Sequence, residues 1–112
     1  GTDSIVRDGS ENIASGEYSA VGGGQRNDAG ARDDAHSVIG GGDSNICIWG
    51  SKNTIAGGTT NGIVGYTDDI QGFDTISGGS KNFISDGSYS VITGGGGLIS
   101  TDGIGEKEEY NN

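Results

Sequence analysis

The side chains of this sequence that could act as a nucleophile, a base or a soft metal ligand are few. The chain has one cysteine, Cys47, and one histidine, His36. Nucleophilic catalysis needs a base beside the attacking group, and a zinc site needs several Cys and His ligands at short spacings. We therefore expect Cys47 to be a small buried thiol and His36 to be a solvated loop residue, and we expect no enzyme activity.

Glycine-rich runs such as "GGGQRNDAG" at residues 22–30 are a second candidate for chemistry, because glycine-rich loops can bind phosphate. No such run ends in Gly-Lys-Ser or Gly-Lys-Thr, and no Gly-x-Gly-x-x-Gly can be read, so we expect no nucleotide site. The net charge of −10 opposes binding to nucleic acid or to anionic membranes. We also expect no membrane insertion, because no apolar stretch approaches the length of a membrane span.

Carboxylates are the most abundant candidate ligands. Asp33 with Asp34, and Asp68 with Asp69 near Asp74, could bind calcium through oxygen ligands. The EF-hand spacing is absent, and "GGGDSNICI" matches the calcium-binding nonapeptide only loosely. Carboxylates at turns are also typical of a solvated surface, so both interpretations stay open, and apart from calcium we expect no cofactor.

The glycines mark a repeat of seven or eight residues. Each unit starts with Asn, Ser or Asp and carries one small or branched apolar residue two positions later. Residues two apart in a strand point to the same side, so both should face inward, and the glycine pairs that follow suit a tight bend. The predicted unit starts are Ser4, Asn12, Ser19, Asn27, Ser37, Asn45, Asn53, Asn61, Asp68, Asp74, Asn82 and Ser90.

Two units, about fifteen to eighteen residues, predict one coil of a narrow parallel β-solenoid with a short strand on each of two faces. The fold class is then all-β, with about six coils, Gly-rich turns and a rod about 30 Å long. In such a coil the polar starts of alternate units stack, and Asn12, Asn27, Asn45 and Asn61 form one ladder. Helix is disfavoured by the glycine content and by the lack of a 3.6-residue apolar stripe.

Five stretches carry a family likeness: "NIASGEYSAVGGG" (12–24), "HSVIGGGDSN" (36–45), "NTIAGG" (53–58), "TISGGSKN" (75–82) and "GSYSVITGGG" (87–96). They resemble the left-handed parallel β-roll in YadA-like heads of trimeric autotransporter adhesins and related repeats of bacteriophage fibres. The resemblance implies a left-handed coil, a homotrimer and an extracellular, cell-surface or virion location. It also implies that a host surface, a matrix protein or a glycan is a partner.

Strict alternation along the strands turns several large apolar side chains outward, where a soluble monomer would prefer polar residues. Such side chains mark an interface for self-association, unless a local kink turns some of them inward. End-to-end stacking into a fibre is also expected from open strand edges. The predicted interface residues are Val38, Ile46, Ile48, Trp49, Phe83 and Val91.

Aromatic side chains cluster at the expected bends. They could stack on sugar rings or pack between chains, and the sequence leaves both alternatives open. The residues concerned are Tyr18, Trp49, Tyr66, Phe73 and Tyr89.

We expect residues 1–97 to form the solenoid repeat domain and residues 98–112 to form a terminal cap or flexible tail. The expected function is that of a non-enzymatic structural or adhesive module of an extracellular or virion fibre. A calcium-binding or ice-binding solenoid is the alternative. For ice binding, only Thr54 and Thr75 are expected to be outward threonines on a strand.

Overall fold

Each coil of this chain consists of two short strands and two corners. The computed structural model describes residues 3–31, 36–48, 52–65, 72–85, 89–97 and 99–100. The described part of the chain contains no helix that is long and apolar enough to cross a membrane. The strands are β1 (Ile5–Val6), β2 (Ile13–Ala14), β3 (Ala20–Val21), β4 (Asp28–Ala31), β5 (Val38–Ile39), β6 (Ile46–Ile48), β7 (Thr54–Ile55), β8 (Gly62–Val64), β9 (Thr75–Ile76), β10 (Phe83–Ser85), β11 (Val91–Ile92) and β12 (Ile99–Ser100).

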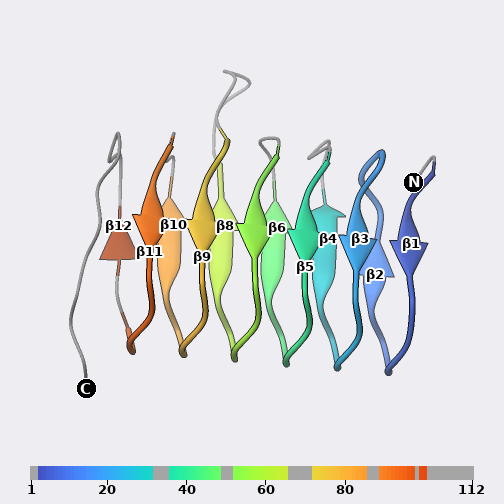
Figure 1. The fold of residues 1–112 in the computed structure, drawn as a ribbon, viewed down its shortest axis with the longest axis horizontal. Helices are drawn as coiled ribbons and strands as arrows, with labels where there is room; N and C mark the ends of the chain where they lie inside the picture. The colour runs from blue at the N-terminus through green and yellow to red at the C-terminus, as the bar shows by residue number, and fades with distance from the viewer. Residues whose placement is uncertain are drawn as a thin grey trace.

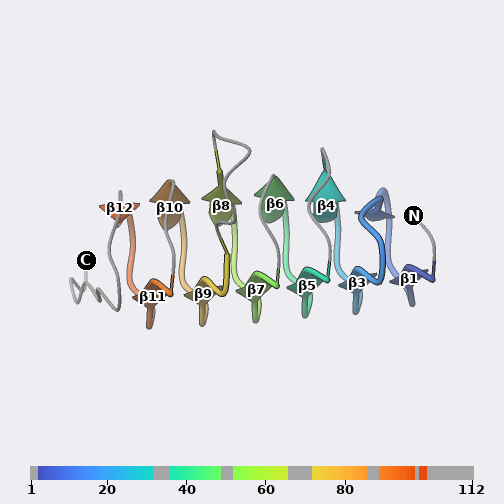
Figure 2. The same ribbon diagram turned by 90° about the horizontal axis from the view of Figure 1, so that it is seen from above.

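The odd-numbered strands form one six-stranded parallel sheet, and the even-numbered strands form a second. Figure 1 shows the chain running down through the odd-numbered strands in front, up through the even-numbered strands behind, and advancing from right to left. Figure 2 shows the two sheets as separate rows. This path, which can be followed in Figures 1 and 2, makes a left-handed β-solenoid. Its extents are 33 × 30 × 15 Å. The predicted all-β parallel solenoid is confirmed.

From β3 to β11 the interior between the two sheets is filled by the apolar residue of each unit, whereas Val6 in β1 is exposed and Ala14 in β2 is half-buried. The core side chains are buried, because alternation along a strand of two to four residues turns them toward the opposite sheet. Cys47 occupies one of these positions and is buried, as predicted. The core consists of Val21, Ala29, Ile39, Cys47, Ile55, Ile63, Ile76, Ile84 and Ile92.

Asparagine side chains form a ladder beside this apolar core. Oδ1 of Asn12 accepts a hydrogen bond from the backbone N–H of Asn27 at 3.0 Å, and Asn27 accepts from Asn45 in the same way at 3.1 Å. The pattern continues from Asn45 to Asn61 and from Asn61 to Asn82, at 2.9 Å each. The predicted stacking is therefore confirmed, and Asn82 extends it. Each asparagine side-chain oxygen thus accepts a hydrogen bond from a backbone N–H group that has no partner within the sheets.

The amide nitrogens of the ladder bind the backbone of the glycine-rich corner. Nδ2 of Asn45 donates to the carbonyl oxygens of Gly41, in its own coil, and Gly58, in the next coil, at 3.0 Å each. Other rungs of the ladder repeat this pair of contacts. The asparagines therefore fix both the shape of each corner and its distance from the next one.

The two kinds of corner differ in length. From an odd-numbered strand to the next even-numbered strand the chain always advances by eight residues (5 to 13, 20 to 28, 38 to 46, 54 to 62, 75 to 83 and 91 to 99). We call this the glycine corner. From an even-numbered strand to the next odd-numbered strand the advance varies (13 to 20, 28 to 38, 46 to 54, 62 to 75 and 83 to 91), and we call this the variable corner. All differences in coil length therefore fall on one edge of the solenoid.

A row of glycines explains the constant length of the glycine corner. Gly24, Gly42 and Gly58 have φ values of +87°, +96° and +97°, which L side chains rarely adopt. A Cβ atom at Gly42 would overlap the carbonyl oxygen of Gly58 in the next coil. Glycine is thus required both by the backbone conformation and by the close approach of successive coils.

One predicted unit, from Asp68 to Ile70, is wrong. β7 pairs directly with β9, and β8 pairs directly with β10, so the sheets leave no place for a strand between these levels. The spacing alone suggested a unit, but the extra residues belong to the variable corner between β8 and β9. Residues 66–71 themselves lie outside the described residues.

The twelfth strand is β12 (Ile99–Ser100), which pairs with β10 two residues beyond the predicted domain boundary at residue 97. Residues 101–112, the remainder of the predicted cap or tail, lie outside the described residues.

Candidate functional site

The outward side chains of the solenoid form two separate broad faces, because the two sheets turn their outer sides in opposite directions (Figure 2). We call these the odd face and the even face after the strands that form them. The outward row of the odd face contains Ile5, Ala20, Val38, Thr54, Thr75 and Val91, which are partners in register. The corresponding row of the even face contains Ile13, Asp28, Ile46, Gly62 and Phe83.

The predicted interface residues fall on both faces and do not form one patch. Ile46, Ile48 and Phe83 lie on the even face, where they are half-buried. Val38 and Val91 lie on the odd face, and Val38 is exposed. Trp49 lies outside the described residues. An interface formed by one face can therefore use only a subset of the predicted residues.

The even face carries the bulkier apolar surface. Ile46 and Ile48 belong to β6, Val64 to β8 and Phe83 to β10, so they cover three successive levels. A Cβ atom at Gly62 would lie 2.9 Å from Cδ2 of Phe83, which places the phenyl ring over this glycine. The missing side chain at Gly62 thus leaves room for the Phe83 ring over β8, next to Ile46.

The odd face is lined mainly by small or β-branched residues. Thr54 and Thr75, the two threonines considered for ice binding, are direct partners in β7 and β9. Val38 precedes them in the row, and Val91 follows them. The outward row is therefore mixed in character, with two threonines among aliphatic side chains.

One carboxylate interrupts the apolar even face. Asp28 lies in β4 between its register partners Ile13 and Ile46. Its Oδ1 atom is buried and has no hydrogen-bond partner among the described residues. Burial raises the pKa of the Asp28 carboxyl above its ordinary value, and a hydrogen bond with Ser15 offsets part of this increase.

Replacing Asp28 with asparagine is expected to stabilise the fold at neutral pH. The folded state binds a proton at Asp28 more readily than the unfolded state does, so stability due to this group falls as the pH rises through the raised pKa. Asp28→Asn should therefore have a higher melting temperature than the wild type at about pH 7 and a similar one at about pH 3, below the ordinary pKa of aspartate. Thermal unfolding at both values tests this.

Asp43 on the glycine corner provides the matched control. A hydrogen bond with Ser44 and the nearby guanidinium of Arg26 hold the pKa of Asp43 below its ordinary value, and Arg26 Nη2 lies 2.9 Å from Asp43 Oδ1. Stability due to this group is lost as the pH falls, so Asp43→Asn should not stabilise the fold at neutral pH. A higher melting temperature for both variants at neutral pH would contradict a specific role of burial at Asp28.

The residues considered for calcium do not come together in the described part of the chain. Asp74 is buried inside the solenoid, and its Oδ1 atom accepts the backbone N–H of Ser90 at 2.8 Å. Asp33, Asp34, Asp68 and Asp69 lie outside the described residues. No group of three potential metal ligands occurs among the residues that are described.

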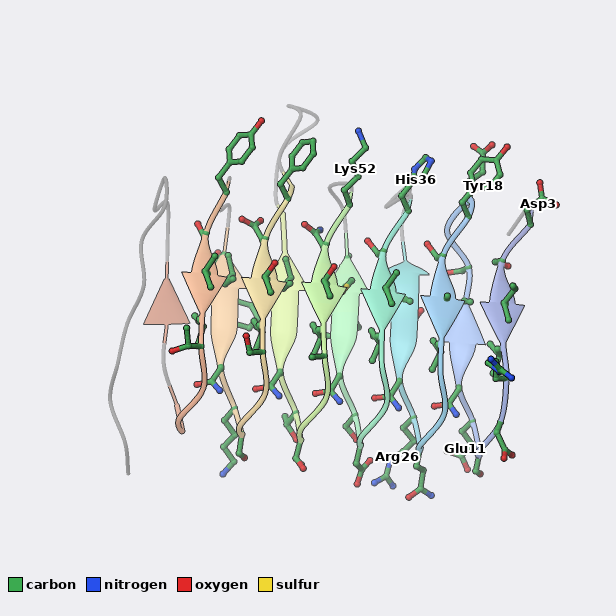
Figure 3. All side chains as sticks on the ribbon, viewed as in Figure 1. Asp3, Glu11, Tyr18, Arg26, His36 and Lys52 are labelled. Carbon is green, nitrogen blue, oxygen red and sulfur yellow. The ribbon has the colours of Figure 1, made fainter. Side chains whose placement is uncertain are left out.

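A second candidate site lies along the variable corner. The residue just before each polar unit start adopts a left-handed backbone, with φ between +53° and +63°. At the variable corner these positions hold Tyr18, His36, Lys52, Phe73 and Tyr89, which we call the ring row. Figure 3 shows Tyr18, His36 and Lys52 along one edge of the solenoid, and Glu11 and Arg26 along the opposite edge.

Side chains of the ring row contact one another in two groups. The rings of Tyr18 and His36 stack with their centroids 5.1 Å apart, and those of Phe73 and Tyr89 stack with theirs 5.0 Å apart. Between these pairs, the Nζ atom of Lys52 lies 4.8 Å from the centroid of Phe73, within the range of a cation–π interaction. Tyr18 with His36, and Lys52 with Phe73 and Tyr89, thus form two contacting groups that lie in one strip along the edge.

The sequence indicated aromatic residues at bends but did not indicate this row. The row can be recognised from position in the sequence, because each of its members directly precedes an inward Ser, Asn or Asp. His36 is exposed, as predicted, but it belongs to the row rather than to an isolated loop. Trp49 and Tyr66, the other two aromatic residues considered, lie outside the described residues.

Comparison of the chain with protein-family models, with curated proteins and with solved structures finds no match.

Proposed function

We propose that this chain is a non-enzymatic structural and adhesive module of an extracellular or virion fibre, and that it self-associates through its even face. The observation that carries the proposal is the apolar cluster of Ile46, Ile48, Val64 and Phe83 on the outer side of that sheet. Large apolar side chains gathered on a flat surface are typical of protein interfaces.

The dimensions of the solenoid are compatible with such an interface. The broad face measures 33 × 30 Å, which limits the contact surface to about 1,000 Å² per partner, close to the roughly 800 Å² of a standard interface. Asp28 is the charged residue in the outward row of the even face, and a partner that covers this face must also cover its carboxylate. Because the pKa of Asp28 is raised, the group is more easily neutralised by a proton, which lowers the free-energy cost of covering it. The resemblance to trimeric adhesin heads favours a homotrimer over other assemblies.

Sedimentation velocity tests the proposal. The wild type is expected to sediment as an oligomer, and Ile46→Lys is expected to sediment as a monomer because it places a charge at the centre of the cluster. Thr54→Lys, which places the same charge on the odd face, should leave the oligomer intact. A monomeric wild type, or equal dissociation by both substitutions, would contradict self-association through the even face.

A further inference from the structure

Burial in the core does not explain the side chains of the ring row, although the rings stack on one another. Tyr18, Phe73 and Tyr89 have φ values of +57°, +63° and +58°, a conformation that bulky residues rarely adopt. Left-handed backbone is unfavourable for a residue with a side chain, because its Cβ atom crowds the following carbonyl oxygen. The rings do not recover this cost in the core, because they remain 49%, 40% and 59% exposed.

The opposite edge shows that the backbone does not require rings at these positions. The glycine corner has the same left-handed positions, and there they hold no aromatic residue. Those residues are Glu11, Arg26, Ser44, Thr60 and Lys81. The aromatic character is therefore a property of one edge alone.

The strip that the ring row forms is long and narrow. Its five members belong to successive levels, and parallel strands lie about 4.8 Å apart, so the strip is about 19 Å long and one side chain wide. A protein partner usually contacts about 800 Å², far more than such a strip offers. The shape suits a chain-like ligand that lies along the edge.

The chemistry of the strip narrows the class of ligand. The net charge of −10 opposes a nucleic acid strand. An extended peptide would need free backbone donors and acceptors, but the backbone N–H groups of His36 and Tyr89 are bonded to Glu17 and Gly72. The stacked rings cover part of one another's faces and leave their edges exposed, next to hydroxyl, imidazole and ammonium groups. Such an edge suits a ligand that combines apolar C–H surface with many hydroxyls.

We propose that the ring row binds a linear saccharide, whose sugar rings contact the exposed parts of Tyr18, Phe73 and Tyr89 while His36 and Lys52 bind its polar substituents. This site goes beyond self-association, because the row lies on an edge and stays accessible whether or not the even face is covered. It acts by binding alone, and no bond is formed or broken.

Titration followed by NMR tests the site, with two unbranched neutral saccharides as probes, cellohexaose and chitohexaose. Binding of either probe should shift the backbone amide signals of the ring row. The left-handed residues of the glycine corner, Thr60 and Lys81 among them, should not shift. The same titration of monomeric Ile46→Lys separates the two proposals, because it should bind even if the wild type proves not to self-associate.

Matched substitutions show whether the rings bind the saccharide. Phe73→Asn and Tyr89→Asn remove a ring but keep a residue that tolerates left-handed backbone, and each should weaken binding about 2- to 12-fold. Thr60→Asn and Lys81→Asn make the equivalent changes at the glycine corner and should leave the dissociation constant unchanged.

Three results would overturn the proposal. The first is the absence of shifts in the ring row with both saccharides. The second is binding that is equally strong in Phe73→Asn, Tyr89→Asn and the wild type. The third is a change in oligomeric state caused by these two substitutions, which would show that the rings pack between copies of the chain.

Discussion

Gly42→Ala is expected to lower the free energy of unfolding by about 2–6 kcal/mol, a large part of the roughly 5–15 kcal/mol that stabilises an ordinary domain. The backbone of Gly42 has φ +96°, where an alanine is strained by about 1–3 kcal/mol. Its Cβ atom would overlap the carbonyl oxygen of Gly58 and lie 2.8 Å from Nδ2 of Asn45. Overpacking of this kind costs a further 1–3 kcal/mol or so. Denaturant unfolding followed by circular dichroism measures the loss.

The neighbouring glycine provides the control. Gly41 does not have a left-handed backbone, and the nearest atom to a Cβ placed there is the carbonyl oxygen of Gly23, at an ordinary distance of 3.8 Å. Gly41→Ala should leave the stability unchanged or raise it by about 0.4–1 kcal/mol, because alanine restricts the unfolded chain. Equal destabilisation by the two substitutions would show that the close approach of successive coils is not the constraint.

Asn45→Ala should lower the free energy of unfolding by a similar amount, for a different reason. Without the amide, the buried N–H of Asn61 loses its acceptor and the carbonyl of Gly41 loses a donor. Each buried group left without a partner costs about 1–3 kcal/mol, which gives a total of about 2–6 kcal/mol. We expect a lower denaturant midpoint for the whole chain. We also expect the coils around Asn45, in the middle of the solenoid, to lose their cooperative unfolding transition.

Two further variants distinguish hydrogen bonding from packing. Asn45→Asp has nearly the same shape and keeps an acceptor for Asn61, but it lacks the amide donors and buries a charge, so it should also be strongly destabilising. Thr54→Ala shortens an outward side chain at the next level and should cost little. If Asn45→Asp is as stable as the wild type, the donors to the glycine corner contribute nothing.

Much of the fold follows from the sequence because one unit encodes one strand. The Asn-x-Ile or Ser-x-Val spacing decides which side chains face inward, and Asn27 and Ile39 are buried where that spacing places them. The mistake at Asp68 arose from the same rule, since a polar residue two positions before an isoleucine also occurs by chance in a corner. If that unit is counted, every later unit is assigned to the opposite sheet, and Asn82 would not lie in the same ladder as Asn61. In the structure Asn82 stacks directly on Asn61.

The candidate sites were harder to predict than the fold. The spacing shows that Val38 and Ile46 point outward, but it says nothing of distance across the molecule, and the two lie on opposite faces. The ring row was not predicted because Tyr18 and Phe73 have a left-handed backbone, which is common for Gly, Asn and Asp but rare for aromatic residues. Only the packing of successive coils forces those residues into it.

One corner of each coil has a constant length and the other does not, so this solenoid can serve as a scaffold that displays grafted peptides. The glycine corner admits one length, but the advance across the variable corner already ranges from seven residues (13 to 20) to thirteen (62 to 75) while the strands on either side stay in register. The entropic cost of a longer loop grows only slowly with its length. A foreign peptide grafted at this corner should therefore leave both sheets unchanged, and the choice of level would set its distance from a second graft in steps of about 4.8 Å.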